Sequence, residues 1–346
     1  MGSRHAAAER LTLPKVDIHV HLEGAIRPAT LMEVAERDGT PLPTGLQRGS
    51  WSFGGFEDFI AQYDALDACL GGLDDLRRFA YELCADEAAE GVRYAEVTFT
   101  ISSHARRLGD WHEPIEAVLD GFASGRRDFG VECQLVLDIA RGGELALAMP
   151  TTDAAIAYAG RGVVALGLGG KEAARPAGAF TAMFERARAA GLHAVPHAGE
   201  VCGPDAIRES LVATSADRIG HGIRCLEDPS LVEELRHRRI PLEVCLTSNV
   251  ATGAVPSLDT HPLPDLIGAG LVVTLNSDDP TMFGSPLADE YERACQQFGL
   301  DEADLAAIAL AGVDASFAPA ALKADIAGAV RHWLASVEPG TTAEPP

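Results

Sequence analysis

The sequence VDIHVH at residues 16–21 is the first of eight short β-rich runs that recur along the chain, and this recurrence indicates the fold. The other seven runs lie at residues 92–99, 131–139, 163–168, 192–197, 217–222, 241–246 and 271–277. Most of these runs are nearly continuously apolar, which is typical of parallel strands covered on both faces. Helical patterns separate them, so the sequence predicts an α/β protein, a (β/α)8 barrel of the TIM type. A doubly wound open sheet is the alternative, but eight evenly spaced units favour closure.

The first crossover of this predicted barrel, residues 40–91, is unusually long and contains extra helices. Within it, residues 56–70 form an amphipathic helical pattern along which Phe56, Phe59 and Tyr63 recur. Ordinary core packing is one interpretation of these aromatic residues. A lid over the barrel mouth is the other, since long insertions in compact domains often serve as lids.

The length of 346 residues fits one large barrel, which typically takes about 250 residues plus insertions. We expect residues 13–337 to form this single domain. Residues 1–12 are polar and residues 338–346 are rich in proline, so both ends are expected to be flexible tails. The hydrophobic content of 47% is enough to bury a large core.

The charge balance limits the partners that the protein can have. With 28 basic and 51 acidic residues the net charge is −23, which repels phosphate backbones and argues against nucleic acid. A small-molecule substrate fits better, and the absence of a long apolar run predicts no membrane span. The N-terminus does not resemble a signal peptide, and seven scattered cysteines without a CxxC pair are typical of reduced thiols in a cytoplasmic protein. The sequence does not specify an oligomeric state.

Polar side chains stand where several predicted strands end, which is where barrel enzymes place their active sites. His19 and His21 are two residues apart on the first strand, so both imidazoles point to the same side. His197 ends the fifth strand, His221 ends the sixth, and Asp278 follows the eighth. A single histidine at a strand end is commonly a hydrogen-bonded core residue. Polar side chains from four strand ends that meet at one barrel mouth predict a metal site.

Nitrogen and carboxylate ligands suit a borderline cation such as Zn²⁺. Three histidines and an aspartate leave room for a water molecule, whose pKa zinc lowers from 15.7 toward about 7. The sequence therefore predicts one zinc ion per chain and a metal-assisted hydrolysis.

Four motifs make the prediction more specific. They are PKVDIHVHLEG at 14–24, HAGE at 197–200, RIGHG at 218–222 and LNSDDP at 275–280. In order and spacing, from about residue 13 to 300, they resemble the adenosine/adenine deaminase family, which also includes 6-aminodeoxyfutalosine deaminases. The HxH motif alone is weak evidence for this resemblance, whereas HAGE followed by GHG and SDDP in this order is specific to the family.

The resemblance implies a ligand set and a pair of catalytic residues. His19, His21, His197 and Asp278 would bind the zinc ion, with His21 also beside the substrate. Two further residues would act on the purine and on the water, namely the proton donor Glu200 and the histidine His221. Glu200 would protonate purine N1, and His221 would orient or deprotonate the zinc-bound water. The implied reaction is hydrolytic deamination of a 6-aminopurine, with adenosine to inosine plus ammonia as the leading assignment.

The resemblance also implies substrate contacts at Gly170 and Asp279. The backbone N–H of Gly170 would meet purine N3, and Asp279 would hydrogen-bond N7. From the residues alone, the alternative for Gly170 is a turn glycine, and the alternative for Asp279 is the cap of a helix with Pro280 at its first position. Ser248 and Asn249 are expected to support the site without touching the reacting atoms.

Two positions depart from the family pattern. Glu23 stands where adenosine-specific members typically carry an aspartate that reaches the ribose 5′ hydroxyl, so adenine and 6-aminodeoxyfutalosine remain rival substrates. Lys171 stands where many relatives have aspartate. It raises a remote alternative, a binuclear amidohydrolase in which a lysine after the fourth strand bridges two metals. We disfavour this alternative because Lys171 falls past the strand end and Glu200 would lack a role. A non-catalytic binding protein is also disfavoured, because every ligand and the acid are present.

Overall fold

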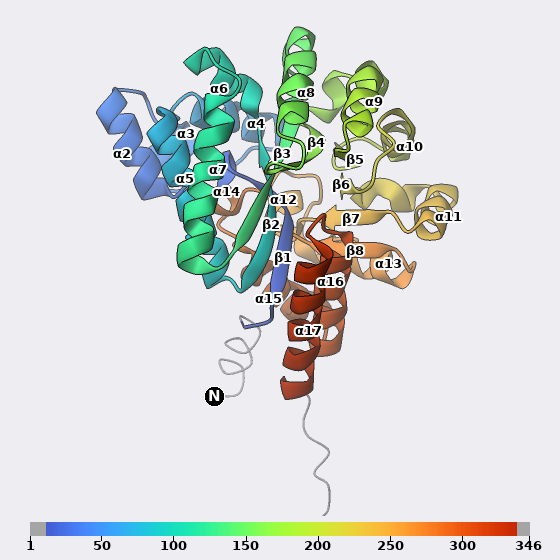
Figure 1. Cartoon of the computed structure of the whole chain (residues 1–346). Helices are drawn as coiled ribbons and strands as arrows, with labels where there is room; N and C mark the ends of the chain where they lie inside the picture. The colour runs from blue at the N-terminus through green and yellow to red at the C-terminus, as the bar shows by residue number, and fades with distance from the viewer. Residues whose placement is uncertain (1–11, 338–346) are drawn as a thin grey trace, which may run out of the picture.

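The computed structural model describes residues 12–337, in which eight parallel strands follow one another in chain order around a barrel (Figure 1). The predicted fold class is therefore confirmed. The predicted tails lie outside the described residues, except for Thr12. The strands are β1 (Lys15–His21), β2 (Val92–Phe99), β3 (Glu132–Ala140), β4 (Val163–Gly169), β5 (His193–Ala198), β6 (Ile219–His221), β7 (Pro241–Val244) and β8 (Val272–Leu275).

The barrel closes at its mouth, just beyond the end of β8. The backbone N–H of Asp278 donates to the carbonyl of His19 over 2.9 Å, and the N–H of His21 donates to the carbonyl of Asp278 over 2.8 Å. Asp278 pairs with Val20 as an isolated parallel bridge. The segment that completes the ring thus also holds the Asp278 carboxylate beside the two histidines of β1.

Helices surround the strands on the outside of the barrel (Figure 1). Strand residues are buried on both faces because one side meets these helices and the other fills the barrel, where Val136, Ala165 and Val195 pack with Phe317. Beyond the first crossover the helices are α6 (Ile101–Leu108), α7 (Glu113–Phe129), α8 (Ala148–Ala157), α9 (Thr181–Ala189), α10 (Pro204–Ala213), α11 (Pro229–Arg238), α12 (Leu246–Ala251), α13 (Leu263–Gly268), α14 (Pro280–Phe283), α15 (Leu287–Phe298), α16 (Glu302–Ala315) and α17 (Ala320–Val337).

The connection between β1 and β2 contains four α-helices, three of them within residues 40–91, where the sequence predicts extra helices. They are α2 (Pro28–Asp38), α3 (Thr44–Gln47), α4 (Phe56–Asp67) and α5 (Leu73–Ala89). The aromatic residues of helix α4 both pack in the core and cover the barrel mouth. Phe59 is buried and packs against Phe53 and Phe283, while Phe56, Phe59 and Tyr63 all line the cavity at the barrel mouth.

Three strands end earlier than their sequence patterns predict. β6 spans only 219–221 and ends one residue before its predicted run, while β7 stops at Val244 and β8 at Leu275, each two residues before the end of its predicted run. At β6 and after β8 the backbone turns into the left-handed region, with φ of 60° at His221 and 63° at Asp278. Such a conformation cannot continue a strand, and it is uncommon for a residue with a side chain. The turn directs both side chains toward the barrel mouth.

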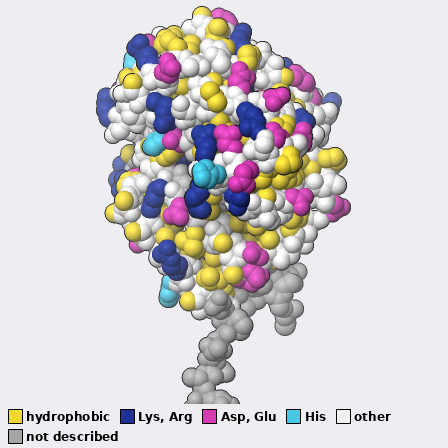
Figure 2. All heavy atoms as spheres, turned by 90° about the vertical axis from the view of Figure 1, so that its right-hand side faces the viewer, with side chains coloured by type: hydrophobic (Ala, Val, Ile, Leu, Met, Phe, Trp, Pro, Cys, Tyr) yellow, Lys and Arg dark blue, Asp and Glu magenta, His cyan; other side chains and the backbone are white. Residues whose placement is uncertain are grey.

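The surface is mixed in charge despite the strongly negative total. Acidic and basic side chains are interspersed over the face in Figure 2. Within residues 12–337, no helix is long and apolar enough to cross a membrane. All seven cysteines lie in this range, and each is a free thiol.

Candidate active site

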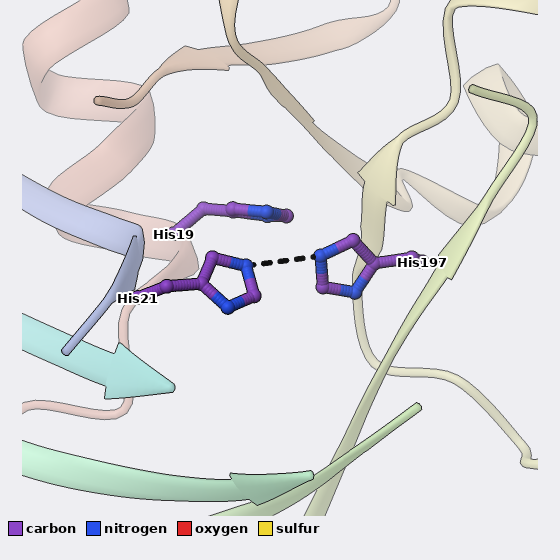
Figure 3. A group of neighbouring side chains, drawn as sticks. All are labelled: His19, His21 and His197. Carbon is purple, nitrogen blue, oxygen red and sulfur yellow. Dashed lines mark hydrogen bonds between the residues drawn. The ribbon is translucent and has the colours of Figure 1, made fainter. Parts of the chain in front are cut away.

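Three imidazoles meet at the mouth of the barrel (Figure 3). His19 and His21 come from β1, and His197 comes from β5 on the opposite side of the ring. One ring nitrogen from each lies within 4.8 Å of those of the other two. The Nε2 atoms of His21 and His197 are 3.3 Å apart. Two neutral rings that face each other this closely leave lone pairs directed at a common space, which is the arrangement that a cation requires.

The hydrogen bonds of His19 test whether these residues fit a metal. Nδ1 of His19 donates to Glu243 over 2.8 Å, and Glu243 is itself held by the buried guanidinium of Arg218. In the neutral form of the ring this bond places the hydrogen on Nδ1 and the lone pair on Nε2, and Nε2 is buried without a hydrogen-bond partner among the described residues. A carboxylate that fixes the outer nitrogen while the inner one stays free is the usual support of a metal-bound histidine. The site therefore fits a metal ion.

Asp278 supplies a carboxylate to the same cluster. Its Oδ1 lies 3.5 Å from Nε2 of His19 and 3.4 Å from Nε2 of His21. Burial opposes ionisation of Asp278, but the hydrogen bond and charge of His19 hold its pKa well below the ordinary value. The carboxylate is thus charged and directed at the histidines. Although burial opposes protonation, the hydrogen bonds to Asp278 and Glu243 raise the pKa of His19 to about 10. A metal ion would take the place of the Nε2 proton of this ring, so that three imidazole nitrogens and one anionic oxygen would form the donor set.

The two other histidines of the cluster are held neutral. Burial lowers the pKa of His197 well below its ordinary value, and the neighbouring imidazoles of His19 and His21 lower it further. Burial also lowers the pKa of His21. A histidine binds a metal through a neutral imidazole, so both rings are in the form that ligation needs.

Glu200 is a buried acid in the loop that follows β5. Burial, together with the negative charge of Asp278, raises its pKa to about 8. The loop is fixed by Glu172, whose carboxylate accepts the backbone N–H groups of Gly199, Val201 and Cys202 over 2.7–3.1 Å. A carboxyl group that is still protonated at neutral pH can act as a general acid.

His221 faces both carboxylates of the site. Its Nε2 lies 3.7 Å from Oε2 of Glu200 and 3.9 Å from Oδ2 of Asp278. These separations exceed a hydrogen bond, so the nitrogen points into the space between the two groups. The predicted catalytic pair, Glu200 and His221, is therefore brought together beside the histidine cluster.

A cavity of about 490 Å³ opens above the cluster. Its walls include His21, His197, Glu200, His221, Asp278, Asp279 and Gly170, with α4 on the outer side. Burial and the adjacent charge of Asp278 raise the pKa of Asp279 well above its ordinary value, which favours the protonated form of this carboxyl. Its Oδ1 is buried with no hydrogen-bond partner among residues 12–337. Asp279 thus presents an unused polar group to whatever occupies the cavity.

Glu23 differs from the other predicted substrate-binding residues, His21, Gly170 and Asp279, because it does not line the cavity. Its Oε1 accepts the N–H of Thr100 over 3.1 Å and Nε2–H of His104 over 3.0 Å. Its Oε2 accepts the hydroxyl of Tyr63 over 3.2 Å. The fully buried carboxylate is already satisfied, and Tyr63 stands between it and the cavity.

Lys171 lies on the outer cavity wall. Its ammonium group pairs with Glu57 of α4 over 2.6 Å, and 40% of its side chain is exposed. The lysine therefore bridges the end of β4 to the helix that covers the mouth. This pairing already engages the group that the binuclear alternative requires as a metal bridge.

Sequence reasoning missed several supporting residues. Glu243 and Glu172 hold His19 and the Glu200 loop, and Arg141 donates to the carbonyl of His197 over 2.6 Å. One signal was available for Glu243, because a charged residue inside an apolar strand must find a buried partner. Glu172 and Arg141 stand in loops, where the sequence carries no comparable signal.

The fold and the site define a class of protein, a barrel enzyme with a cluster of metal-ligand residues and a buried acid at its mouth. Comparison with known proteins supports this class. The model of a family described as adenosine deaminase matches residues 14–333. The chain belongs to this family, and it is a hydrolytic deaminase of the type that acts on aminopurine-like substrates.

Three relatives illustrate the range of the family. An aminodeoxyfutalosine deaminase of Streptomyces coelicolor is 42% identical over 94% of this chain and 86% of its own. The crystal structure of an adenine deaminase from Arthrobacter aurescens has a TM-score of 0.88 at 32% identity, covering 93% of this chain and 99% of its own. An amidohydrolase structure from Burkholderia ambifaria with bound zinc has a TM-score of 0.89 at 29% identity, covering 95% of this chain and 93% of its own.

Proposed function

We propose that this protein is a zinc-dependent deaminase that hydrolyses the 6-amino group of a purine. The observation that carries the proposal is the position of Glu200. It is a buried carboxyl with a raised pKa, and it faces the cavity together with His221 and the histidine cluster. Hydrolysis of an aromatic amine needs an acid at the ring and a nucleophile at the carbon, and this site offers a place for both.

His19, His21, His197 and Asp278 would hold the metal. A bound zinc ion supplies Lewis acidity that makes a water molecule acidic at neutral pH. The zinc bound in the Burkholderia ambifaria structure supports the identity of the metal. The neutral imidazoles and the unpartnered Nε2 of His19 support the ligand set.

The chain's own residues act on the purine. Glu200 would protonate N1, which withdraws electrons from C6 and makes it open to attack. Asp279, held protonated, would donate a hydrogen bond to N7, and Gly170 would offer its backbone N–H to N3. His221 would contact the oxygen that attacks C6. Together these contacts would orient the ring so that C6 faces the attacking oxygen, and the amino group would leave as ammonia.

Among the three substrates that the sequence leaves open, we place 6-aminodeoxyfutalosine ahead of adenosine and adenine. The carboxylate of Glu23 is already satisfied by Thr100, His104 and Tyr63, so it is a poor partner for a free ribose 5′ hydroxyl. The cavity also continues outward from the metal cluster to Arg106 and Lys171. The Streptomyces coelicolor aminodeoxyfutalosine deaminase, at 42% identity, supports the same order.

An ultraviolet assay of kcat/KM on the zinc-loaded enzyme tests this order. We expect 6-aminodeoxyfutalosine to exceed adenosine and adenine by at least about tenfold, which corresponds to about 1.4 kcal/mol of transition-state binding. A lead for adenosine would show that Glu23 releases its carboxylate to the ribose, and the substrate proposal would fail while the reaction stands. A lead for adenine would show that the ribose makes no productive contact.

A further inference from the structure

A directional chain of hydrogen bonds runs from the backbone of α13 to the catalytic histidine. The N–H of Leu263 donates to Nδ1 of His261 over 3.1 Å. Nε2 of His261 lies 3.1 Å from Oδ1 of Asn249, and Nδ2 of Asn249 lies 3.1 Å from Nδ1 of His221. All four residues are buried, so water does not compete for these bonds.

The direction of this chain follows from its first member, because a backbone N–H can only donate. Nδ1 of His261 must therefore accept, which places the hydrogen of that neutral ring on Nε2. That hydrogen is donated to Oδ1 of Asn249, so the amide nitrogen of Asn249 faces His221. The amide nitrogen can only donate, and Nδ1 of His221 must accept. The hydrogen of the His221 ring is consequently on Nε2.

We propose that Asn249 and His261 are positioning residues that fix the Nε2–H tautomer of His221. His221 then donates a hydrogen bond from Nε2 into the space between Glu200 and Asp278, where the oxygen that attacks the purine must lie. A neutral ring with hydrogen on Nε2 has no lone pair there. His221 therefore orients the attacking oxygen and does not take its proton. This inference rests on the proposed deamination for its chemistry, but the tautomer itself does not depend on the substrate.

The direct test is nitrogen-15 NMR of the zinc-loaded protein labelled at histidine. The His221 signals are assigned by their loss in a His221→Gln variant. We expect Nε2 to be the protonated nitrogen and Nδ1 the unprotonated one at neutral pH. A hydrogen on Nδ1, or on both nitrogens, would overturn the proposal. Because this readout needs no turnover, it stands even if the proposed deaminase activity is not found.

The Asn249→Asp variant reverses one bond with almost no change in shape. A carboxylate accepts from both of its neighbours, so the hydrogen of His221 should move to Nδ1. Loss of one donor to the transition state costs about 100-fold to 1,000-fold in rate. We expect a fall of that size in kcat with a much smaller change in KM, since the lost contact is made to the reacting oxygen. Unchanged kcat with the hydrogen still on Nε2 would contradict the proposal.

Two further variants separate this role from simple packing. Asn276→Asp introduces the same charge at an equally buried asparagine, whose amide bonds Thr274 and the N–H of Ile18 and no histidine. It should leave the His221 tautomer as it is. In His261→Gln, the side-chain amide can still donate to Asn249, so the tautomer and most of kcat should be retained. A His261→Gln variant with the hydrogen on Nδ1 of His221 would count against the chain. If the Asn249→Asp variant does not fold, the nitrogen-15 spectrum of the wild-type protein alone tests the position of the hydrogen on His221.

Discussion

Glu200 shows how burial sets the chemistry of a single residue. Its raised pKa keeps it protonated at neutral pH, as an acid that donates to a purine nitrogen must be. Replacing Glu200 with Gln keeps the shape but removes the transferable proton. We expect kcat to fall by about 100-fold to 10,000-fold while metal content is unchanged. An exposed acid, Glu185 on α9, provides the matched control, because Glu185→Gln should leave kcat unchanged. Full activity in Glu200→Gln would contradict the assigned mechanism.

The same residue predicts a dependence on pH. A general acid acts in its protonated form, so the activity is present below the pKa and is lost as pH rises through it. Because burial raises the pKa of Glu200 to about 8, the basic limb of kcat/KM should lie near that pH. A pH profile measures this directly. A rate that stays constant well above pH 8 would show that another group is the acid.

Gly24 permits the position of Asp279. A Cβ atom at residue 24 would lie 1.8 Å from Oδ1 of Asp279, which is far inside van der Waals contact. Gly24→Ala should therefore displace the carboxyl that we assign to purine N7, and raise KM by about tenfold or more. Gly328→Ala on α17 is the control, because nothing lies within 4 Å of the added carbon. Equal kinetics in both variants would argue against the role of Asp279.

At the scale of the residue, the sequence predicted the groups at strand ends but not those that hold them. The sequence motifs at the strand ends identify four of these groups, His19, His21, His197 and Asp278. No such motif identifies Glu172 and His261, because their roles depend on loops that bring distant segments together. The sequence also predicted Glu23 beside the substrate, but it carried no signal that His104 and Tyr63 would bond its carboxylate, with Tyr63 lining the cavity.

The loop between β5 and α10 is the element on which the acid depends. Glu172 accepts three backbone N–H groups of this loop and nothing else among the described residues replaces it. Glu172→Gln turns one acceptor into a donor and should destabilise the protein by about 1–3 kcal/mol. Denaturant unfolding of the variant measures the loss, and kcat should fall with it because Glu200 becomes less fixed. Wild-type stability would mean that the loop is held by other contacts.

The strand and helix assignments were largely predictable, since apolar runs and helical periodicity are local signals. The boundaries of the predicted run 92–99 coincide with those of β2. The ends of β6 and β8 were not predictable, because a left-handed backbone at a residue other than glycine, as at His221 and Asp278, is uncommon and has no local signal in the sequence. The ends of the strands that carry the proposed catalytic side chains are therefore the part of the structure that is hardest to predict from this sequence.

At the scale of the whole molecule, the barrel brings the proposed metal ligands from β1, β5 and the segment after β8 into one cluster. Zinc bound there stabilises only the folded chain, so removing it with a chelator should lower the melting temperature. The loss of stability is about 4 kcal/mol when free zinc exceeds its dissociation constant a thousandfold. Differential scanning calorimetry with and without zinc measures this effect. Identical melting temperatures would mean that no zinc binds to the folded barrel.

Metal stoichiometry separates the deaminase from the binuclear alternative. We expect elemental analysis to give one zinc per chain, and Lys171→Met to retain it, because Lys171 pairs with Glu57 at the outer wall. Two metals per chain, with loss of one in Lys171→Met, would favour the binuclear hydrolase.

The central claim is that this barrel replaces the 6-amino group of a purine with an oxygen atom from water. Mass spectrometry of the product formed by the zinc-loaded enzyme in oxygen-18 water tests it most directly, with 6-aminodeoxyfutalosine, adenosine and adenine each supplied as substrate. We expect a 6-oxopurine that carries the heavy oxygen, together with one ammonia per turnover. The absence of any deaminated product from all three substrates would contradict it.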